Sequence, residues 1–114
     1  AVSHAEIYRT CYAISIFHGD NLASPTVIGA QAANELLNVK GIKASFILTP
    51  YNGMIYISAR SIDEVNVQVI MERMGGGGHL NIAGAQIENG TLEEGIASIK
   101  RTLDAMIAEG ELDG

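Results

Sequence analysis

The spacing of apolar residues predicts three strands in the first half of the chain. Residues 11–17 are apolar almost throughout, as is typical of a central strand covered on both faces. Apolar and polar residues alternate over 42–49, and a Pro-Tyr-Asn-Gly turn over 50–53 joins them to a further strand over 54–59. The second and third strands therefore form a hairpin.

Helical spacing of apolar residues, with matching cap residues, predicts three helices. The first covers residues 24–40, begins with Ser-Pro, and is stopped by a left-handed Gly41. A short second helix is capped by Asn66 and ends at Gly75. The third starts with a capping box over residues 91–94. Its apolar face is formed by Leu92, Ile96, Ile99, Leu103, Met106 and Ile107.

A strand, a helix and a second strand in succession form a βαβ unit. The sequence thus predicts an α/β fold: a mixed β-sheet with a βαβ crossover, an antiparallel hairpin and about three helices packed on it. Residues 82–87 are small and apolar, and they predict a short turn of helix followed by a short strand. We expect residues 1–10 to be a linker from an upstream domain, 11–110 to form this domain, and 111–114 to be a frayed tail.

Composition and charge narrow the partners that such a domain can bind. The 114 residues are 47% hydrophobic and carry a net charge of −6, from seven Lys and Arg against thirteen Asp and Glu. This composition is ordinary for one compact domain. It disfavours long nucleic acids, whose binding depends on cations that release phosphate counterions. A small phosphate ligand held by local groups remains compatible with it.

The lone cysteine and the lengths of the apolar runs indicate in which cellular compartment the chain lies. Cys11 lies in the first predicted strand and has no second cysteine to pair with, so we expect a buried structural thiol in a reducing compartment. No apolar run approaches the roughly 18 residues that span a bilayer. The sequence therefore predicts a cytoplasmic domain that makes no membrane contact itself.

Four glycines followed by a histidine are the sharpest candidate for a functional site. Such a run is entropically unfavourable, so a fold retains it where the backbone needs a positive φ or approaches something closely. Gly76, Gly77 and Gly78 can turn their amides toward a phosphate, and a helix beginning near His79 would add its positive end. The His79 side chain can donate a further hydrogen bond. The alternative is a flexible turn.

The second candidate site is Arg60-Ser61, at the end of the hairpin strand and just before the helix capped by Asn66. Loops between a strand end and a helix start commonly present polar groups to ligands. Arg60 can hold a phosphate in a bidentate fork, and Ser61 can assist. The alternative is a solvated surface charge without a binding role.

The sequence offers little for metal-assisted hydrolysis. That chemistry needs several Asp and His ligands that converge on one or two ions, whereas His4, His18 and His79 are scattered. The local pair of His18 and Asp20 indicates a loop. We therefore expect neither a catalytic residue nor a metal ligand in this chain.

Taken in order, these segments resemble the DHH-associated domain, the C-terminal half of DHH phosphoesterases. The resemblance rests on residues 57–61, 66–72, 75–79 and 83–86. Their order, spacing and intervening elements agree with that domain over about residues 12–107. Within the family, the chain is most similar to the bacterial membrane-anchored cyclic-di-AMP phosphodiesterases.

The resemblance implies that one polypeptide has two domains with different roles, one that holds the metal ions and one that binds the substrate phosphates. An upstream DHH domain would hold two manganese ions, with transmembrane, sensory and cyclase-like segments expected before it. The Asp-His-His motif that names the family is absent here, so this chain alone is expected to be inactive. The substrate implied is cyclic-di-AMP or a short oligonucleotide. The residues that would bind its phosphates are Arg60, Ser61, Gly76, Gly77, Gly78 and His79.

Two other functions remain open at this point. One is a nucleic-acid-binding module, as in related single-strand exonucleases, although the acidic balance and sparse aromatic residues disfavour it. The other is a homo-oligomerisation domain, as in alanyl-tRNA synthetases that carry a related glycine-rich module. The histidine after the glycines is generally lacking there, so His79 favours the hydrolase. A homodimer is compatible with any of these functions.

Overall fold

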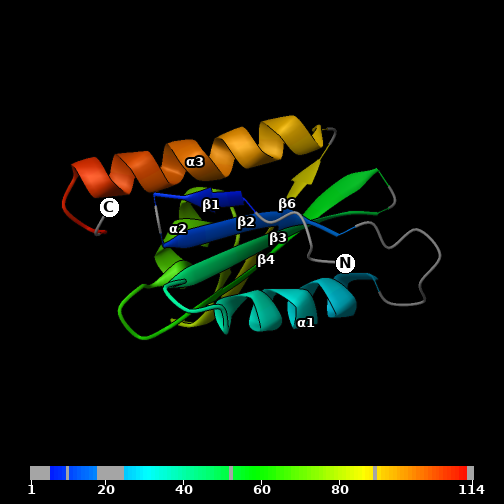
Figure 1. Ribbon diagram of the computed structural model, residues 1–114. Coiled ribbons are helices and arrows are strands. Elements are labelled where there is room, and N and C mark those ends of the chain that lie inside the picture. Colours follow the sequence, from blue (N-terminus) through cyan, green and yellow to red (C-terminus); the bar gives the residue numbers. More distant parts are fainter. Residues whose placement is uncertain (1–5, 10, 18–24, 52, 89, 113–114) are drawn as a thin grey trace.

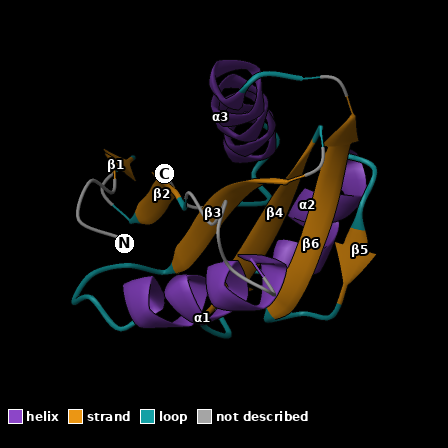
Figure 2. Cartoon of the chain, turned by 90° about the vertical axis from the view of Figure 1, so that its right-hand side faces the viewer, coloured by secondary structure: helices purple, strands orange, loops and turns teal. Residues whose placement is uncertain are grey.

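The computed structural model describes residues 6–9, 11–17, 25–51, 53–88 and 90–112. Within these residues, six strands form one sheet, with α1 on one face and both α2 and α3 on the other (Figures 1 and 2). The strands are β1 Glu6–Tyr8, β2 Tyr12–Ile16, β3 Ala44–Tyr51, β4 Met54–Ser61, β5 Gly77–Gly78 and β6 Ile82–Glu88. The helices are α1 Pro25–Leu37, α2 Val67–Arg73 and α3 Leu92–Ala108. The predicted α/β fold is confirmed.

The sheet is mixed, as the sequence predicts, and its strands lie in the order β1-β2-β3-β4-β6-β5. β2 and β3 are parallel, with Tyr12 opposite Ala44, and α1 connects them as the crossover helix. The other neighbouring strands pair antiparallel. The hairpin of β3 and β4 closes with Tyr51 opposite Met54. β4 continues to Ser61, so it is two residues longer than the strand predicted over residues 54–59.

The alternation in β3 separates two covered faces of the sheet. Phe46 and Leu48 point into the core under α2 and α3, whereas Ser45 and Thr49 are buried on the side of α1. The Ser45 hydroxyl donates a hydrogen bond of 2.6 Å to a carbonyl of α1. A Cβ atom on Gly29 of α1 would lie 2.5 Å from the Thr49 hydroxyl oxygen. Small residues therefore let this helix approach the sheet closely.

The caps predicted for α2 and α3 are confirmed, whereas the predicted stop of the first helix at Gly41 is wrong, because α1 ends at Leu37 and Gly41, with φ +91°, lies in the turn that follows. The Asn66 side chain accepts a hydrogen bond from the Val69 amide, and Thr91 forms a reciprocal capping box with Glu94. These bonds satisfy amides that have no partner within the first turn of a helix. Gly75 follows α2 with φ +88°, which is a conformation that glycine adopts at little cost.

The expectation of helix near His79 and within residues 82–87 is wrong. Residues 82–88 form one strand, β6, which pairs along nearly the whole of β4. The His79 amide donates to the Ile82 carbonyl at 2.7 Å, so residues 79–82 form a tight turn between β5 and β6. Strand pairing satisfies the backbone groups of this segment, and the small residues fit between β4 and β5.

Both ends of the described chain pack more closely than the sequence indicated. Residues 6–8, expected in a linker, form β1, and the Tyr8 hydroxyl donates to the Asp104 carboxylate of α3 at 2.8 Å. Residues 111 and 112 lie in the expected frayed tail. However, Leu112 is only 9% exposed in the core, and Arg73 forms ion pairs with Glu109 and Glu111.

Cys11 is buried in the core and is a free thiol, in agreement with the structural role predicted for it. The loop expected over residues 18–21 and the Ser24 cap lie outside the described residues. In the part of the chain that the structure describes, no helix is long and apolar enough to cross a lipid bilayer.

Candidate functional site

The face of the sheet that carries α1 is only partly covered. On β4, Ile55, Ile57 and Ala59 point into the core, so the alternate side chains point to the opposite face. These are Met54, Tyr56, Ser58 and Arg60, each partly exposed. The residues opposite them on β6 are Glu88, Gln86, Gly84 and Ile82. We call this part of the sheet the open face.

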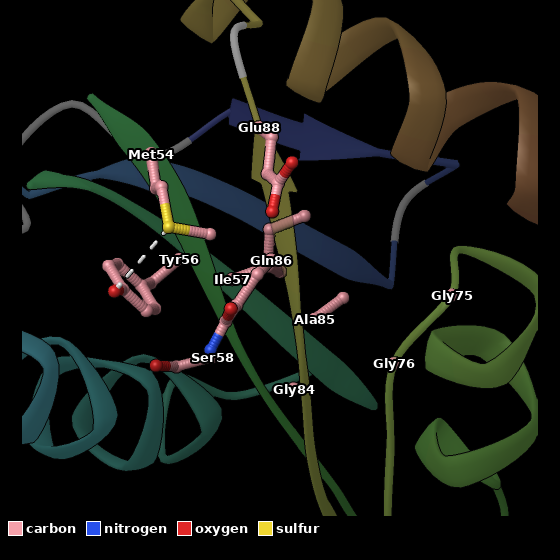
Figure 3. Close-up of a pocket in the computed structure, with 10 residues that line it drawn as sticks. All are labelled: Met54, Tyr56, Ile57, Ser58, Gly75, Gly76, Gly84, Ala85, Gln86 and Glu88. Atoms are coloured by element: carbon pink, nitrogen blue, oxygen red, sulfur yellow. Dashed lines mark hydrogen bonds between the residues drawn. The ribbon is translucent and has the colours of Figure 1, made fainter. Parts of the chain in front are cut away.

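A cavity of about 530 Å³ lies on the open face, between β4, β6 and the start of the glycine segment (Figure 3). Tyr56 and Ser58 line it from β4, and Gln86 and Glu88 line it from β6 (Figure 3). Gly76 borders it on the far side of β6. Of the six residues predicted to bind phosphate, only Gly76 lines this cavity.

Gly77 lies in a cross-strand row directly beside the cavity. Ser58 is opposite Gly84, and Gly84 is opposite Gly77, so the row runs from β4 through β6 to β5. The two glycines leave the sheet without side chains over two neighbouring strands. A ligand can therefore approach the backbone here more closely than elsewhere on the open face.

The next row runs from Arg60 through Ile82 toward His79. Arg60 is opposite Ile82, and the hydrogen bond from the His79 amide to the Ile82 carbonyl makes His79 the following member of the row. Ala83 points into the core, so alternation places Ile82 on the open face with Arg60, and His79 follows β5 in the turn beside Ile82. The fold thus brings together two site residues that are 19 positions apart in the sequence.

Arg60 has the chemistry of an anion-binding residue. Its Nη1 donates to its neighbour's carbonyl, that of Ala59, at 2.8 Å, and its Nε is buried without a hydrogen-bond partner among the described residues. No described carboxylate lies within ion-pair distance, whereas Arg9, Lys43 and Arg73 each have one. Burial lowers the pKa of the Arg60 guanidinium from its ordinary value, because the charged form loses water. An anion would compensate that loss.

Gly76 and Gly78 are required by packing against β6. A Cβ atom on Gly76 would lie 2.1 Å from the Gly84 carbonyl oxygen, and one on Gly78 would lie 2.5 Å from the Ala83 Cα atom. Gly78 also has a φ of +145°, which other residues rarely adopt. These two glycines therefore let β5 lie against β6 at short range.

Gly77 differs from its neighbours. Its φ is not in the left-handed region, and no atom lies within 4 Å of a Cβ atom built on it. Of the two reasons that the sequence suggests for a glycine here, a special backbone conformation is excluded. Neither packing nor a left-handed backbone therefore requires a glycine at position 77.

The glycine segment is not an open ring of amides, contrary to the expectation from the sequence. The Gly76 amide donates to the Met71 carbonyl at 2.8 Å, and the His79 amide is bonded to Ile82. Since hydrogen-bonded and non-bonded pairs alternate in an antiparallel ladder, Gly77 falls in a bonded pair with β6. The same alternation directs the Gly78 amide away from β6, toward the edge of the sheet.

Ser61 lies on the opposite face from Arg60 and is only 5% exposed. Its hydroxyl lies 2.6 Å from the Val65 carbonyl and 3.3 Å from the Leu80 carbonyl. The Asn81 side chain donates to the Ser61 carbonyl at 3.1 Å. The structure therefore joins Ser61 to the turn over residues 79–81, and it does not bring the hydroxyl to the open face with Arg60.

The cavity residues Tyr56, Ser58 and Gln86 were not identified from the sequence. A usable signal was present: in a strand, every second residue shares a face, so Arg60 has Ser58 and Tyr56 as its companions. The contribution of Gln86 depends on which strand pairs with β4, and that pairing was not predicted. Among the described residues, no group of three or more His, Cys, Asp or Glu could hold a metal ion.

The solved structures that resemble this chain share its fold. An exopolyphosphatase-related protein from Bacteroides fragilis matches with a TM-score of 0.75 at 23% identity, over 91% of this chain and 32% of that one. The C-Ala domain of alanyl-tRNA synthetase from Aquifex aeolicus matches with a TM-score of 0.64 at 17% identity, over 88% of this chain and 97% of that one. At these identities the likeness concerns the fold alone.

Sequence comparison gives a more specific assignment. The cyclic-di-AMP phosphodiesterase PdeA of Listeria monocytogenes serotype 1/2a (strain 10403S) is 44% identical over 105 residues. The match covers 91% of this chain but only 16% of PdeA, so the chain spans about one sixth of that relative's length. The sequence profile of the DHHA1 domain matches residues 11–109. As its motifs indicated, the chain belongs to the DHHA1 domain family.

Proposed function

We propose that this DHHA1 domain is the substrate-binding lobe of a DHH-family phosphodiesterase and binds a nucleotide phosphate through Arg60 and His79. The observation that carries the proposal is the partly buried Arg60 guanidinium, which has no carboxylate partner among the described residues. It lies on the open face, in the row that leads to His79 and beside the row of a glycine, Gly77, that packing does not require. A phosphate placed here gains charge-assisted hydrogen bonds from Arg60.

Cyclic-di-AMP is the substrate that we propose, with a short oligonucleotide as the alternative within the same class. The name of the Listeria relative, at 44% identity, supports the cyclic dinucleotide. The net charge of −6 supports a small substrate over a long polymer, because the domain has few cations to spread along a phosphate backbone.

The hydrolytic step belongs, in this proposal, to an upstream DHH domain of the same polypeptide. Manganese would be the metal of that domain and would activate water there. The described residues of this chain do not fit a metal site, since no group of suitable ligands is present among them. The role of this domain is to hold and orient the phosphate with Arg60 and His79. We place the domain in the cytoplasm and the membrane anchor of the full-length protein upstream.

Turnover of cyclic-di-AMP by the full-length protein tests the role of Arg60. Arg60→Ala is expected to lower kcat/KM by about 30-fold, equivalent to about 2 kcal/mol of transition-state stabilisation. Arg60→Lys is also expected to lose activity, because an ammonium does not reproduce the guanidinium fork. Thermal melting should barely change in either variant.

Arg101→Ala is the matched control. It removes the same charge from an exposed position on α3, where the Arg101 side chain makes one long hydrogen bond, of 3.4 Å, to Ser98. Its kcat/KM should equal that of the wild type. If Arg60→Ala is as active as Arg101→Ala, Arg60 is an ordinary surface charge and the proposed phosphate site is wrong.

A further inference from the structure

We infer that the cavity on the open face is a nucleobase subsite, which takes the base of the nucleotide whose phosphate lies at Arg60. The inference rests on the proposed phosphate site and adds a second point of recognition to it. The cavity is lined by Tyr56 and Ser58 from β4 and by Gln86 and Glu88 from β6, beside the row that carries Gly77 (Figure 3).

Tyr56 and Met54 provide a surface for a flat aromatic ring. The Tyr56 ring is partly exposed in the cavity, and its hydroxyl lies 3.8 Å from the Met54 sulfur (Figure 3). Tyr51 stands at a ring-centroid distance of 6.5 Å and at 49° to the Tyr56 ring, so the two rings are tilted rather than stacked. A base can stack on a single aromatic ring, and a thioether adds a polarisable contact.

Gln86 and Glu88 provide polar groups that are not used within the described fold. Neither side chain forms a hydrogen bond or an ion pair with another described residue, and both are exposed. The Gln86 amide can donate and accept, as the edge of a purine requires. The Glu88 carboxylate only accepts, so it favours a base that donates from an exocyclic amino group. This combination fits adenine better than uracil.

The distribution of charge fixes the direction in which a nucleotide would lie. Arg60 and His79 are at one end of the open face, and Glu88 is at the other, beyond Tyr56. A carboxylate repels a second phosphate at that end, so the cavity suits an uncharged base. Tyr56 and Arg60 are four residues apart on one strand, which separates their Cα atoms by about 14 Å. If the Tyr56 and Arg60 side chains reach toward each other, the distance between their ends is shorter than this. That distance is comparable with the length of an extended nucleotide.

The row between these two ends has little side-chain bulk. Ser58, Gly84 and Gly77 cross the three strands there, and only Ser58 has side-chain atoms. The sugar of a nucleotide with its phosphate at Arg60 and its base at Tyr56 would pass over this row. The sugar would then occupy the space above Gly77 that the packing of the domain leaves open.

Titration of the isotope-labelled chain with AMP and with ribose 5-phosphate tests the inference by NMR. The two ligands share the sugar and the phosphate, so their difference reports on the base. Ribose 5-phosphate should shift the amide signals around Arg60, Gly77 and His79. AMP should shift the same signals and, in addition, those around Tyr56 and Gln86. AMP should bind roughly ten-fold more tightly, as expected from one stacked base.

Two variants and one control locate the effect. Tyr56→Leu keeps an apolar side chain but removes the ring, and it should lower AMP affinity roughly ten-fold without changing the affinity for ribose 5-phosphate. Gln86→Ala should also weaken AMP binding selectively. Gln68→Ala, on the exposed side of α2 where Gln68 contacts Glu72, should leave both affinities unchanged. UMP should bind more weakly than AMP because it lacks the amino group.

The outcomes separate the two proposals. Equal affinities for AMP and ribose 5-phosphate, or an unchanged AMP affinity in Tyr56→Leu, would overturn the nucleobase subsite while leaving the phosphate site standing. UMP binding as tight as AMP binding would overturn the role of Glu88. A response at Tyr56 without one at Arg60 and His79 would overturn the phosphate site. If neither ligand shifts any of these signals, both proposals are wrong.

Discussion

Substitutions of Gly76 and Gly77 by alanine should have opposite effects on the stability of the domain. A Cβ atom on Gly76 would lie 2.1 Å from the Gly84 carbonyl oxygen and 2.7 Å from the Ala85 Cα atom, both of which belong to the backbone of β6. Gly76→Ala must therefore separate β5 from β6, and it should destabilise the domain by about 2 kcal/mol. Gly77→Ala meets no atom within 4 Å and should stabilise the domain by about 0.5 kcal/mol, because alanine has less freedom in the unfolded chain.

A larger side chain at Gly77 should lower activity without lowering stability. Gly77→Val places a branched side chain on the open face of the edge strand β5, at the end of the row that starts at Ser58 and beside the row of Arg60. In the full-length protein it should lower kcat/KM for cyclic-di-AMP at least ten-fold, or about 1.4 kcal/mol. Thermal melting of the chain should show a transition no lower than that of the wild type.

Two results would contradict this account of Gly77. Normal turnover by Gly77→Val would mean that no ligand comes close to the open face at Gly77, and that the glycine has no role in binding. A large loss of stability in Gly77→Ala would instead show that the space around its Cβ position is filled in solution. Gly76→Ala serves as the internal control, since it should lose stability whether or not the site binds phosphate.

Three further predictions concern the activity of the isolated chain and the stability of two variants. The isolated chain with manganese should hydrolyse cyclic-di-AMP at a negligible rate, and manganese-dependent turnover near that of a complete phosphodiesterase would contradict this. Ser61→Ala should lower the free energy of unfolding by about 1 to 2 kcal/mol in a denaturant titration, since the carbonyls that its hydroxyl contacts lose a buried partner. Leu112→Ala should destabilise by about 2 kcal/mol if residue 112 packs in the core, whereas no change would indicate a frayed tail.

Local sequence signals predicted those parts of the fold that depend on nearby residues. Cap residues such as Asn66 and Thr91 act within one turn, and Gly75 has the positive φ that ends a helix, whereas Gly41 has a positive φ but lies four residues beyond Leu37, the last residue of α1. Residues 6–8 were not predicted as a strand because a short edge strand depends on its neighbour in space. Residues 82–88 are small and apolar, a composition compatible with helix, and only pairing with β4 decides in favour of a strand.

The site was predictable in type but not in arrangement. Arg60 and His79 stand out in the sequence because a strand-end arginine and a glycine-histidine run are common means of holding phosphate. The register of β6 against both β4 and β5 decides that they lie in one row across the sheet, and no pattern in the sequence gives that register. Alternation along β4 puts the Ser61 hydroxyl on the core side, and the Gly76 amide is already bonded to the Met71 carbonyl of α2.

The turn over residues 79–81 is tied to two other elements of the domain. Its Leu80 carbonyl accepts from the Val67 amide at the start of α2, and its Asn81 carbonyl accepts from the Ser61 amide at the end of β4. Arg60 and His79 are therefore carried by segments already fixed relative to each other. A ligand that contacts both side chains need not order the backbone on binding, so more of its interaction energy appears as affinity. In the proposed site, the buried Ser61 would therefore contribute to recognition by holding in place the segments that carry Arg60 and His79.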